Sequence, residues 1–150
     1  MKTNRLRVLF LCTGNSCRSQ MAEYWCRHLH PDSIEAYSAG TDPHGVNENA
    51  VRVMAEAGVS MQGARSNHVD EFVDKKLDLV VTVCDHANEN CPIFPRGVKT
   101  IHVGFEDPPR LARGARTEEE ALDHYRRVRD EIRAFVASLP DSVRPPREPS

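Results

Sequence analysis

The sequence has no long apolar run and no excess of charge of one sign. Its longest apolar stretches have four or five residues, whereas a helix that crosses a bilayer needs about 20. Its 20 basic and 22 acidic residues give a net charge of −2, which is not the strongly basic surface that binds nucleic acids or anionic membranes. We therefore expect neither nucleic acid nor a membrane among its partners.

A cleavable leader and an even set of cysteines are also missing. The N-terminal segment MKTNRLRVLFLCTG is basic and then apolar, but its apolar part is short and has no small-x-small cleavage site. We interpret it as a first strand and expect a cytoplasmic protein.

An odd number of cysteines in such a chain favours catalytic, redox or metal chemistry over a fixed disulfide framework. The five are Cys12, Cys17, Cys26, Cys84 and Cys91.

The hydrophobic pattern alternates between expected strands and expected helices. Strands are predicted at 5–11, 34–38, 77–83 and 99–103, and helices at 19–29, 48–57 and 117–139. This alternation predicts an α/β fold with a central four-stranded parallel sheet and helices on both faces. We expect one domain over residues 1–139 and a flexible C-terminal tail at 140–150.

A polar cluster, CTGNSCRS, joins the first expected strand to the first expected helix. Short Gly- and Asn-containing loops can point successive N–H groups inward, and the helix that follows adds its positive dipole end. Arg18 supplies a planar fork that matches two oxygens of an oxyanion. In this environment we expect a lowered pKa and a nucleophilic thiolate at Cys12, with Ser19 as a hydrogen-bond donor to the sulfur. The expected oxyanion-binding residues are Thr13, Gly14, Asn15, Ser16, Cys17, Arg18 and Ser19.

The pattern C-x5-R-S between a strand and a helix resembles the low-molecular-weight tyrosine phosphatase fold family. More closely, the segments CTGNSCRSQMAE, SAGT, VTVCDHANENCP and GFEDPPR resemble the thioredoxin-coupled arsenate reductases built on that fold. The resemblance extends over about residues 6–138. It implies reduction of arsenate to arsenite, with phosphate or sulfate as competing oxyanions.

The resemblance also implies a relay of three thiols. Cys12 attacks arsenate held by Arg18 and the loop, and Asp107 protonates the departing oxygen. Cys84 then forms a transient Cys12–Cys84 disulfide. Cys91 next converts it to Cys84–Cys91, which thioredoxin reduces. From topology alone, Cys84 ends the third expected strand, so it should lie at the same sheet edge as Cys12.

Two alternatives stay open. A phosphatase that hydrolyses phosphate monoesters needs only Cys12, Arg18 and Asp107. Phosphatases of this fold typically carry aromatic residues directly after that Asp-Pro, whereas this chain has DPPRLARG, so aryl substrates are less favoured. The third class is a non-catalytic oxyanion or arsenical sensor, whose thiols bind without turnover.

No tightly bound cofactor is expected. The resemblance implies a weak potassium site at Asn15, Glu23, Ser38 and Asn67. Members of the family that bind potassium carry Asp at the position of Asn67, and the change removes a negative charge from a site for a hard cation. We therefore do not expect strong potassium binding, and we expect no other metal site.

Overall fold

The computed structural model of the chain describes residues 5–84, 94 and 97–139. Within these ranges, no helix is long and apolar enough to cross a membrane. The predictions for Cys91 and for a tail at 140–150 lie outside the described residues.

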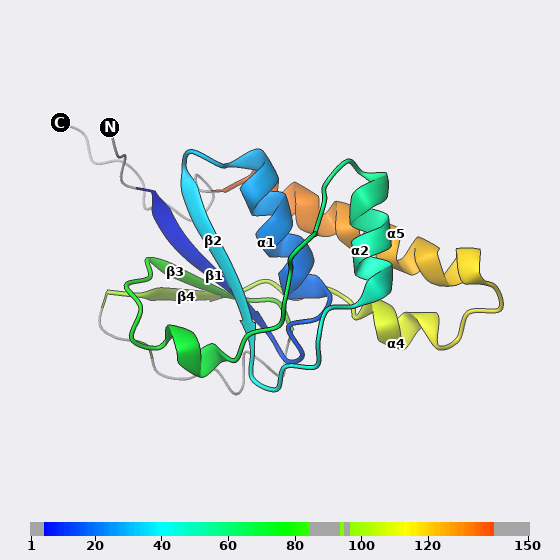
Figure 1. Cartoon of the computed structure of the whole chain (residues 1–150), viewed down its shortest axis with the longest axis horizontal. Helices are drawn as coiled ribbons and strands as arrows, with labels where there is room; N and C mark the ends of the chain where they lie inside the picture. The colour runs from blue at the N-terminus through cyan, green and yellow to red at the C-terminus, as the bar shows by residue number, and fades with distance from the viewer. Residues whose placement is uncertain (1–4, 85–93, 95–96, 140–150) are drawn as a thin grey trace.

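Four parallel strands form one sheet in the order β2-β1-β3-β4, as Figure 1 shows. The inner strand β1 is a run of branched and aromatic side chains that are buried on both faces, as parallel sheets require. All four predicted strands are present with shifted ends. Their bounds are β1 (Leu6–Cys12), β2 (Ile34–Gly40), β3 (Leu79–Thr82) and β4 (Lys99–His102).

Three helices, α1, α2 and α5, pack together on one side of the sheet (Figure 1). The indole N–H of Trp25, on α1, donates to the carbonyl of Arg129, on α5, at 3.1 Å. The predicted helices are confirmed, and two short elements without a periodic pattern are added. The bounds are α1 (Arg18–Leu29), α2 (Glu48–Glu56), η1 (a 3-10 helix, Val69–Phe72), α4 (Pro108–Ala112) and α5 (Glu118–Ala137).

The strand β2 shows that both faces of the sheet are covered. Its Ser38 faces α1, where its hydroxyl donates to Glu23. The neighbouring Tyr37 points to the opposite face, because successive strand residues alternate. There its ring lies 5.5 Å from the ring of Phe72, on η1. The helical segment η1 therefore covers part of the second face.

The long helix α5 begins with half of a capping box. The Thr117 hydroxyl accepts from the N–H of Glu120 at 3.0 Å. The Glu120 carboxylate, however, accepts from the N–H of Arg116 instead of reaching back to Thr117. One side of the helix is buried, which fixes its orientation against the rest of the fold. The buried residues are Leu122, Tyr125, Val128, Ile132 and Val136.

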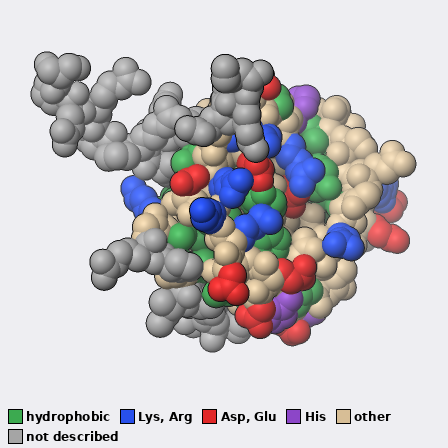
Figure 2. Space-filling model, turned by 60° about the vertical axis from the view of Figure 1, so that its left-hand side comes forward, with side chains coloured by type: hydrophobic (Ala, Val, Ile, Leu, Met, Phe, Trp, Pro, Cys, Tyr) green, Lys and Arg blue, Asp and Glu red, His purple; other side chains and the backbone are tan. Residues whose placement is uncertain are grey.

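Charged side chains of both signs lie close together on the surface. Basic side chains gather near the middle of the face in Figure 2, with acidic ones beside them. Ion pairs such as Arg5–Glu35 at 3.0 Å and Arg126–Glu56 at 2.8 Å neutralise many of them locally. Such exposed pairs contribute little stability each.

Gly40, the last residue of β2, provides a test of how tightly the sheet holds the loop of residues 12–19. A Cβ at Gly40 would lie 2.4 Å from the carbonyl oxygen of Thr13, which is a clash with backbone. We expect Gly40→Ala to lower the free energy of unfolding by about 1–3 kcal/mol, as overpacking does. Urea denaturation measures this change. In the control Gly114→Ala, the added Cβ meets its nearest atom at 3.8 Å. Equal stability of the two variants would contradict the close approach.

Candidate active site

The carbonyl groups of the loop at residues 12–19, here called the oxyanion loop, are paired on its outer side. The segment 41–47, which joins β2 to α2, donates four N–H groups to them at 2.8–3.2 Å. In a trans peptide the N–H points opposite to the preceding carbonyl. The N–H groups of these peptide units therefore point away from the paired carbonyls, and residues of the same loop line a cavity. The pairs are Thr41 to Cys12, Asp42 to Thr13, His44 to Gly14 and Asn47 to Ser16.

Asn15 holds the turn at the centre of the oxyanion loop. It adopts a left-handed conformation, with φ of 46°, which Asn tolerates better than most residues. Its side chain is fully buried and uses both ends. Nδ2 donates to the Ser19 hydroxyl at 2.8 Å, and Oδ1 accepts from the N–H of Asn67 at 2.7 Å. The role predicted for Asn15 in the loop therefore has a geometric basis.

The Cys12 thiol ends β1 at the floor of the cavity. Its Sγ lies 2.8 Å from the Ser19 hydroxyl oxygen. Because that oxygen already accepts from Asn15, the hydroxyl proton is directed at the sulfur. Asn15, Ser19 and Cys12 thus form a chain of hydrogen bonds that stabilises negative charge on the sulfur.

Burial nevertheless raises the pKa of the Cys12 thiol above its ordinary value. The hydrogen bonds from Ser19 and the charge of Arg18 lower the pKa, but they do not outweigh desolvation, and the nearby Cys84 raises it further. The sequence-based expectation of a lowered pKa is therefore wrong. A buried thiolate needs more compensation than the Arg18 guanidinium and the side-chain and backbone groups of Ser19 provide.

Arg18 and Asp107 close one side of the cavity. The Arg18 guanidinium donates to the carbonyl of Phe105 at 2.9 Å and lies 3.6 Å from the Asp107 carboxylate. Asp107 occupies the N-cap position of α4, yet its side chain makes no capping bond. The carboxyl group therefore remains beside the cavity, where the predicted general acid has to be.

Cys84 lies in the same cavity as Cys12, as its position after β3 predicted. The cavity has a volume of about 520 Å³. The Cys84 sulfur is 3.3 Å from the Thr13 hydroxyl, so the oxyanion loop and the second thiol are in direct contact. Two thiols and an anion-binding loop therefore share one space. The lining residues are Cys12, Thr13, Gly14, Ser16, Cys17, Arg18, His44, Cys84, Asp107, Pro109 and Arg113.

The other two described cysteines lack an activating environment. Burial raises the pKa of the Cys26 thiol, on α1, to about 12. It also raises the pKa of Cys17 well above its ordinary value. At neither thiol does a hydrogen bond to the sulfur offset burial as Ser19 does in part at Cys12, so we assign neither a role, although Cys17 lines the cavity.

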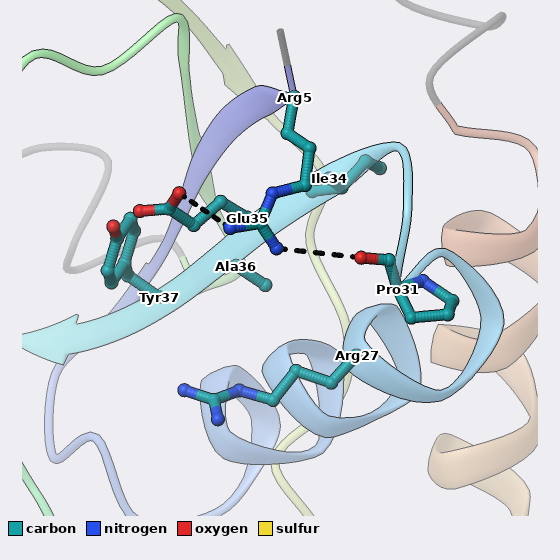
Figure 3. Close-up of a pocket in the computed structure, with 7 residues that line it drawn as sticks. All are labelled: Arg5, Arg27, Pro31, Ile34, Glu35, Ala36 and Tyr37. Carbon is teal, nitrogen blue, oxygen red and sulfur yellow. Dashed lines mark hydrogen bonds and ion pairs between the residues drawn. The ribbon is translucent and has the colours of Figure 1, made fainter. Parts of the chain in front are cut away.

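A second cavity, of about 360 Å³, lies beside the start of β2. Figure 3 shows Arg5 reaching across it to the Glu35 carboxylate and to the carbonyl of Pro31. No thiol lines it, so it offers no nucleophile. The first cavity is therefore the candidate active site. Sequence reasoning missed His44 and Arg113 there, because neither belongs to a motif that the sequence analysis singled out.

The four residues of the predicted potassium site are brought together, but their oxygens already face hydrogen-bond donors. Glu23 accepts from the Ser38 hydroxyl at 2.6 Å and pairs with Arg27. Burial raises the pKa of Glu23, and both neighbours oppose that shift. The amide of Asn67 donates to the carbonyl of Ser38 at 3.3 Å. Asn15 Oδ1 is likewise occupied. The Arg27 guanidinium on the one carboxylate of the set opposes a cation by its charge, so this donor set fits a potassium ion poorly.

A thiol at the floor of a loop between a strand and a helix, with an arginine and an acid beside it, is the arrangement found in phosphatase-like enzymes. The chain belongs to the low molecular weight phosphotyrosine protein phosphatase family, which it matches over residues 7–146.

Within that family, several proteins that the chain resembles are arsenate reductases. The chain is 47% identical to an arsenate reductase of Halalkalibacterium halodurans over 86% of its own length and 91% of the relative. A crystal structure of arsenate reductase from Archaeoglobus fulgidus is 32% identical, with a TM-score of 0.68 over 88% of this chain and 97% of that one. A low molecular weight protein tyrosine phosphatase from T. tengcongensis is 25% identical, with a TM-score of 0.70 over 92% and 99%. The predicted fold and the predicted relationship to arsenate reductases are confirmed.

The chain from Asn15 through Ser19 to Cys12 predicts how the thiol ionises. In Ser19→Ala the donor to the sulfur is lost, so the pKa of Cys12 should rise further. The pH profile of Cys12 alkylation by iodoacetamide, read by peptide mass spectrometry, should move to higher pH. Ser60→Ala, an exposed change elsewhere, serves as the control. An unmoved profile in Ser19→Ala would show that the hydroxyl does not stabilise the thiolate.

Proposed function

We propose that the chain reduces arsenate to arsenite with three of its own thiols, Cys12, Cys84 and Cys91. The observation that supports this reaction is the presence of Cys84 in the cavity that Cys12 and the oxyanion loop form. Hydrolysis of a phosphate ester needs one thiol, whereas a two-electron reduction by sulfur needs two thiols that can form a disulfide.

In the first step the oxyanion loop and Arg18 hold arsenate above Cys12. The thiolate attacks arsenic, a sulfur–arsenic bond forms, and one arsenic–oxygen bond breaks. Asp107, beside Arg18, gives the departing oxygen its proton, so the leaving group is water. Arsenic remains in its pentavalent state, and no electron has yet been transferred.

In the second step the Cys84 thiolate attacks the sulfur of Cys12. The sulfur–arsenic bond breaks and its electron pair stays on arsenic, which leaves as arsenite. The two sulfurs are oxidised to the Cys12–Cys84 disulfide. Because the Cys84 sulfur already contacts Thr13 of the oxyanion loop, a local movement brings it to Cys12. The direction of attack has to be nearly in line with the bond that breaks.

Cys91 completes the cycle. Its thiolate attacks Cys84, a Cys84–Cys91 disulfide forms, and Cys12 is released as a thiolate. We propose thioredoxin as the dithiol that reduces this disulfide, and the cytoplasm as the compartment, since a thiol relay needs a reducing environment.

The relay is tested by giving the reduced protein one equivalent of arsenate and mapping its disulfides by mass spectrometry. We expect Cys84–Cys91 in the wild type. In Cys91→Ser the relay should stop one step earlier, at Cys12–Cys84. Cys26→Ala is the matched control, since Cys26 lies on α1 outside the cavity, and it should give the wild-type disulfide.

Three outcomes separate the alternatives. Free thiols with turnover of an aryl phosphate would establish the phosphatase, and bound but unconsumed arsenate would establish the sensor. The wild-type disulfide could also be reduced by glutathione with glutaredoxin and not by thioredoxin. That result would retain the relay and reject thioredoxin as the reductant.

Hydrolysis of phosphate monoesters is supported as a secondary activity. Arg18 and Asp107 lie beside Cys12, and this set suffices for hydrolysis of a monoester. Phosphate and arsenate share shape and charge, so the oxyanion loop binds both. We propose slow hydrolysis of p-nitrophenyl phosphate that is lost in Cys12→Ser.

We also propose that the protein works without potassium, because Arg27 and the Asn67 amide occupy the oxygens that would bind the ion. A ligand that binds the folded state raises its melting temperature, so exchange of KCl for NaCl at equal ionic strength should leave Tm and kcat/KM unchanged. In Asn67→Asp with Arg27→Gln, a carboxylate is added and the guanidinium is removed, so potassium should raise Tm. A rise of Tm with potassium in the wild type would contradict the proposal.

A further inference from the structure

The mouth of the active-site cavity carries two basic side chains that the proposed reaction does not use, His44 and Arg113. We propose that they select a free tetrahedral oxyanion over its organic monoesters. This inference rests on the proposed function, because it concerns the choice of substrate at the same site.

The backbone of His44 anchors it over the oxyanion loop, and its exposed ring lies beside the Asp42 carboxylate. Its N–H donates to the carbonyl of Gly14 at 2.9 Å. Ring atom Nε2 lies 3.3 Å from the Asp42 carboxylate. The other ring nitrogen, Nδ1, lies next to Gly14, 2.9 Å from where a Cβ would stand on that residue. The ring therefore turns one nitrogen to Asp42 and the other to the loop.

The contact with Asp42 determines whether the second ring nitrogen of His44 donates or accepts a hydrogen bond. When Asp42 accepts from Nε2–H, Nδ1 accepts a hydrogen bond in the neutral ring and donates one in the charged ring. A free oxyanion satisfies both states, because it carries hydroxyl groups and charged oxygens together. An ester oxygen that bears a carbon group has no proton to donate.

Arg113 approaches the cavity from another element, at the end of α4. It is exposed, and its side chain pairs with no carboxylate among the described residues. Arg18 differs, since its guanidinium is already held by Phe105 and Asp107. Arg113 therefore keeps its fork available for an anion at the mouth.

The position of these two side chains matters because of what a bound substrate exposes there. In-line attack by Cys12 from the floor of the cavity requires the departing substituent to lie opposite the sulfur, toward the mouth. In arsenate or phosphate that substituent is an oxygen, which His44 and Arg113 would bind beside Asp107, the group that protonates it. In a phenyl ester it is an aromatic ring, which covers both polar groups without satisfying them.

The direct test compares inorganic phosphate with phenyl phosphate as ligands. Titration calorimetry is carried out on Cys12→Ser, which binds without reacting. Changing His44 to Ala and Arg113 to Ala should weaken phosphate binding about tenfold each, as the loss of a charge-assisted hydrogen bond does. Phenyl phosphate should bind as well as before, or better, so the preference for the free anion disappears in the double variant.

Matched variants separate recognition from structure. Arg116→Ala removes an exposed arginine that does not line the cavity, and it should leave both ligands unaffected. Arg113→Lys keeps the charge and should restore part of the phosphate affinity. Equal weakening of both ligands would mean that the side chains only support the fold, and unchanged affinity for both would mean that they do not touch the anion. Either result overturns the proposal.

The proposed reduction can fail independently of this selectivity. Phosphate binding in Cys12→Ser involves no redox step, so a loss of preference in the double variant stands even if arsenate gives no disulfide in the wild type. Conversely, disulfide formation with an unchanged preference would retain the relay and reject the role of His44 and Arg113.

Discussion

The site depends on one set of backbone hydrogen bonds, those between segment 41–47 and the carbonyls of the oxyanion loop. They turn the carbonyl groups outward, and the geometry of the peptide unit then turns the N–H groups inward. Every other feature builds on this pairing. Gly40 has to lack a side chain because the oxyanion loop passes close to it. Asn15 has to adopt a left-handed conformation at the turn of that loop. The anion-binding property is therefore a property of two strand-to-helix connections together.

The same enclosure that organises the anion site works against the nucleophile. Cys12 is buried, and burial raises the pKa of its thiol in spite of Ser19 and Arg18. An exposed cysteine would ionise more easily, but it would lose the N–H groups around it. Burial thus has two opposite effects on attack at an oxyanion. It raises the pKa of the sulfur, and it holds the groups that bind the substrate in place. The hydrogen bond from Asn15 to Ser19 reduces that conflict, because it aims a hydroxyl proton at the sulfur.

The sequence predicted the strands, the long helices and the oxyanion loop because these have periodic or compositional signals. Asp107 and Cys84 were also placed correctly, since both follow strands of one parallel sheet. The pairing by segment 41–47 was not predictable in this way, because it is made by backbone groups that any residue carries. His44 reaches the cavity only through that pairing. The pKa direction of Cys12 was wrong because motif reasoning counts neighbouring charges and does not measure burial.

Electrostatics also orders the proposed relay. Cys84 raises the pKa of Cys12, which means that two thiolates in this cavity repel each other. Once the Cys12 sulfur is bonded to arsenic it is no longer a thiolate, and it becomes the electrophile that Cys84 attacks in the proposed relay. The electron pair of the sulfur–arsenic bond then passes to arsenic as the disulfide forms, so oxidation of the two sulfurs is coupled to reduction of the substrate.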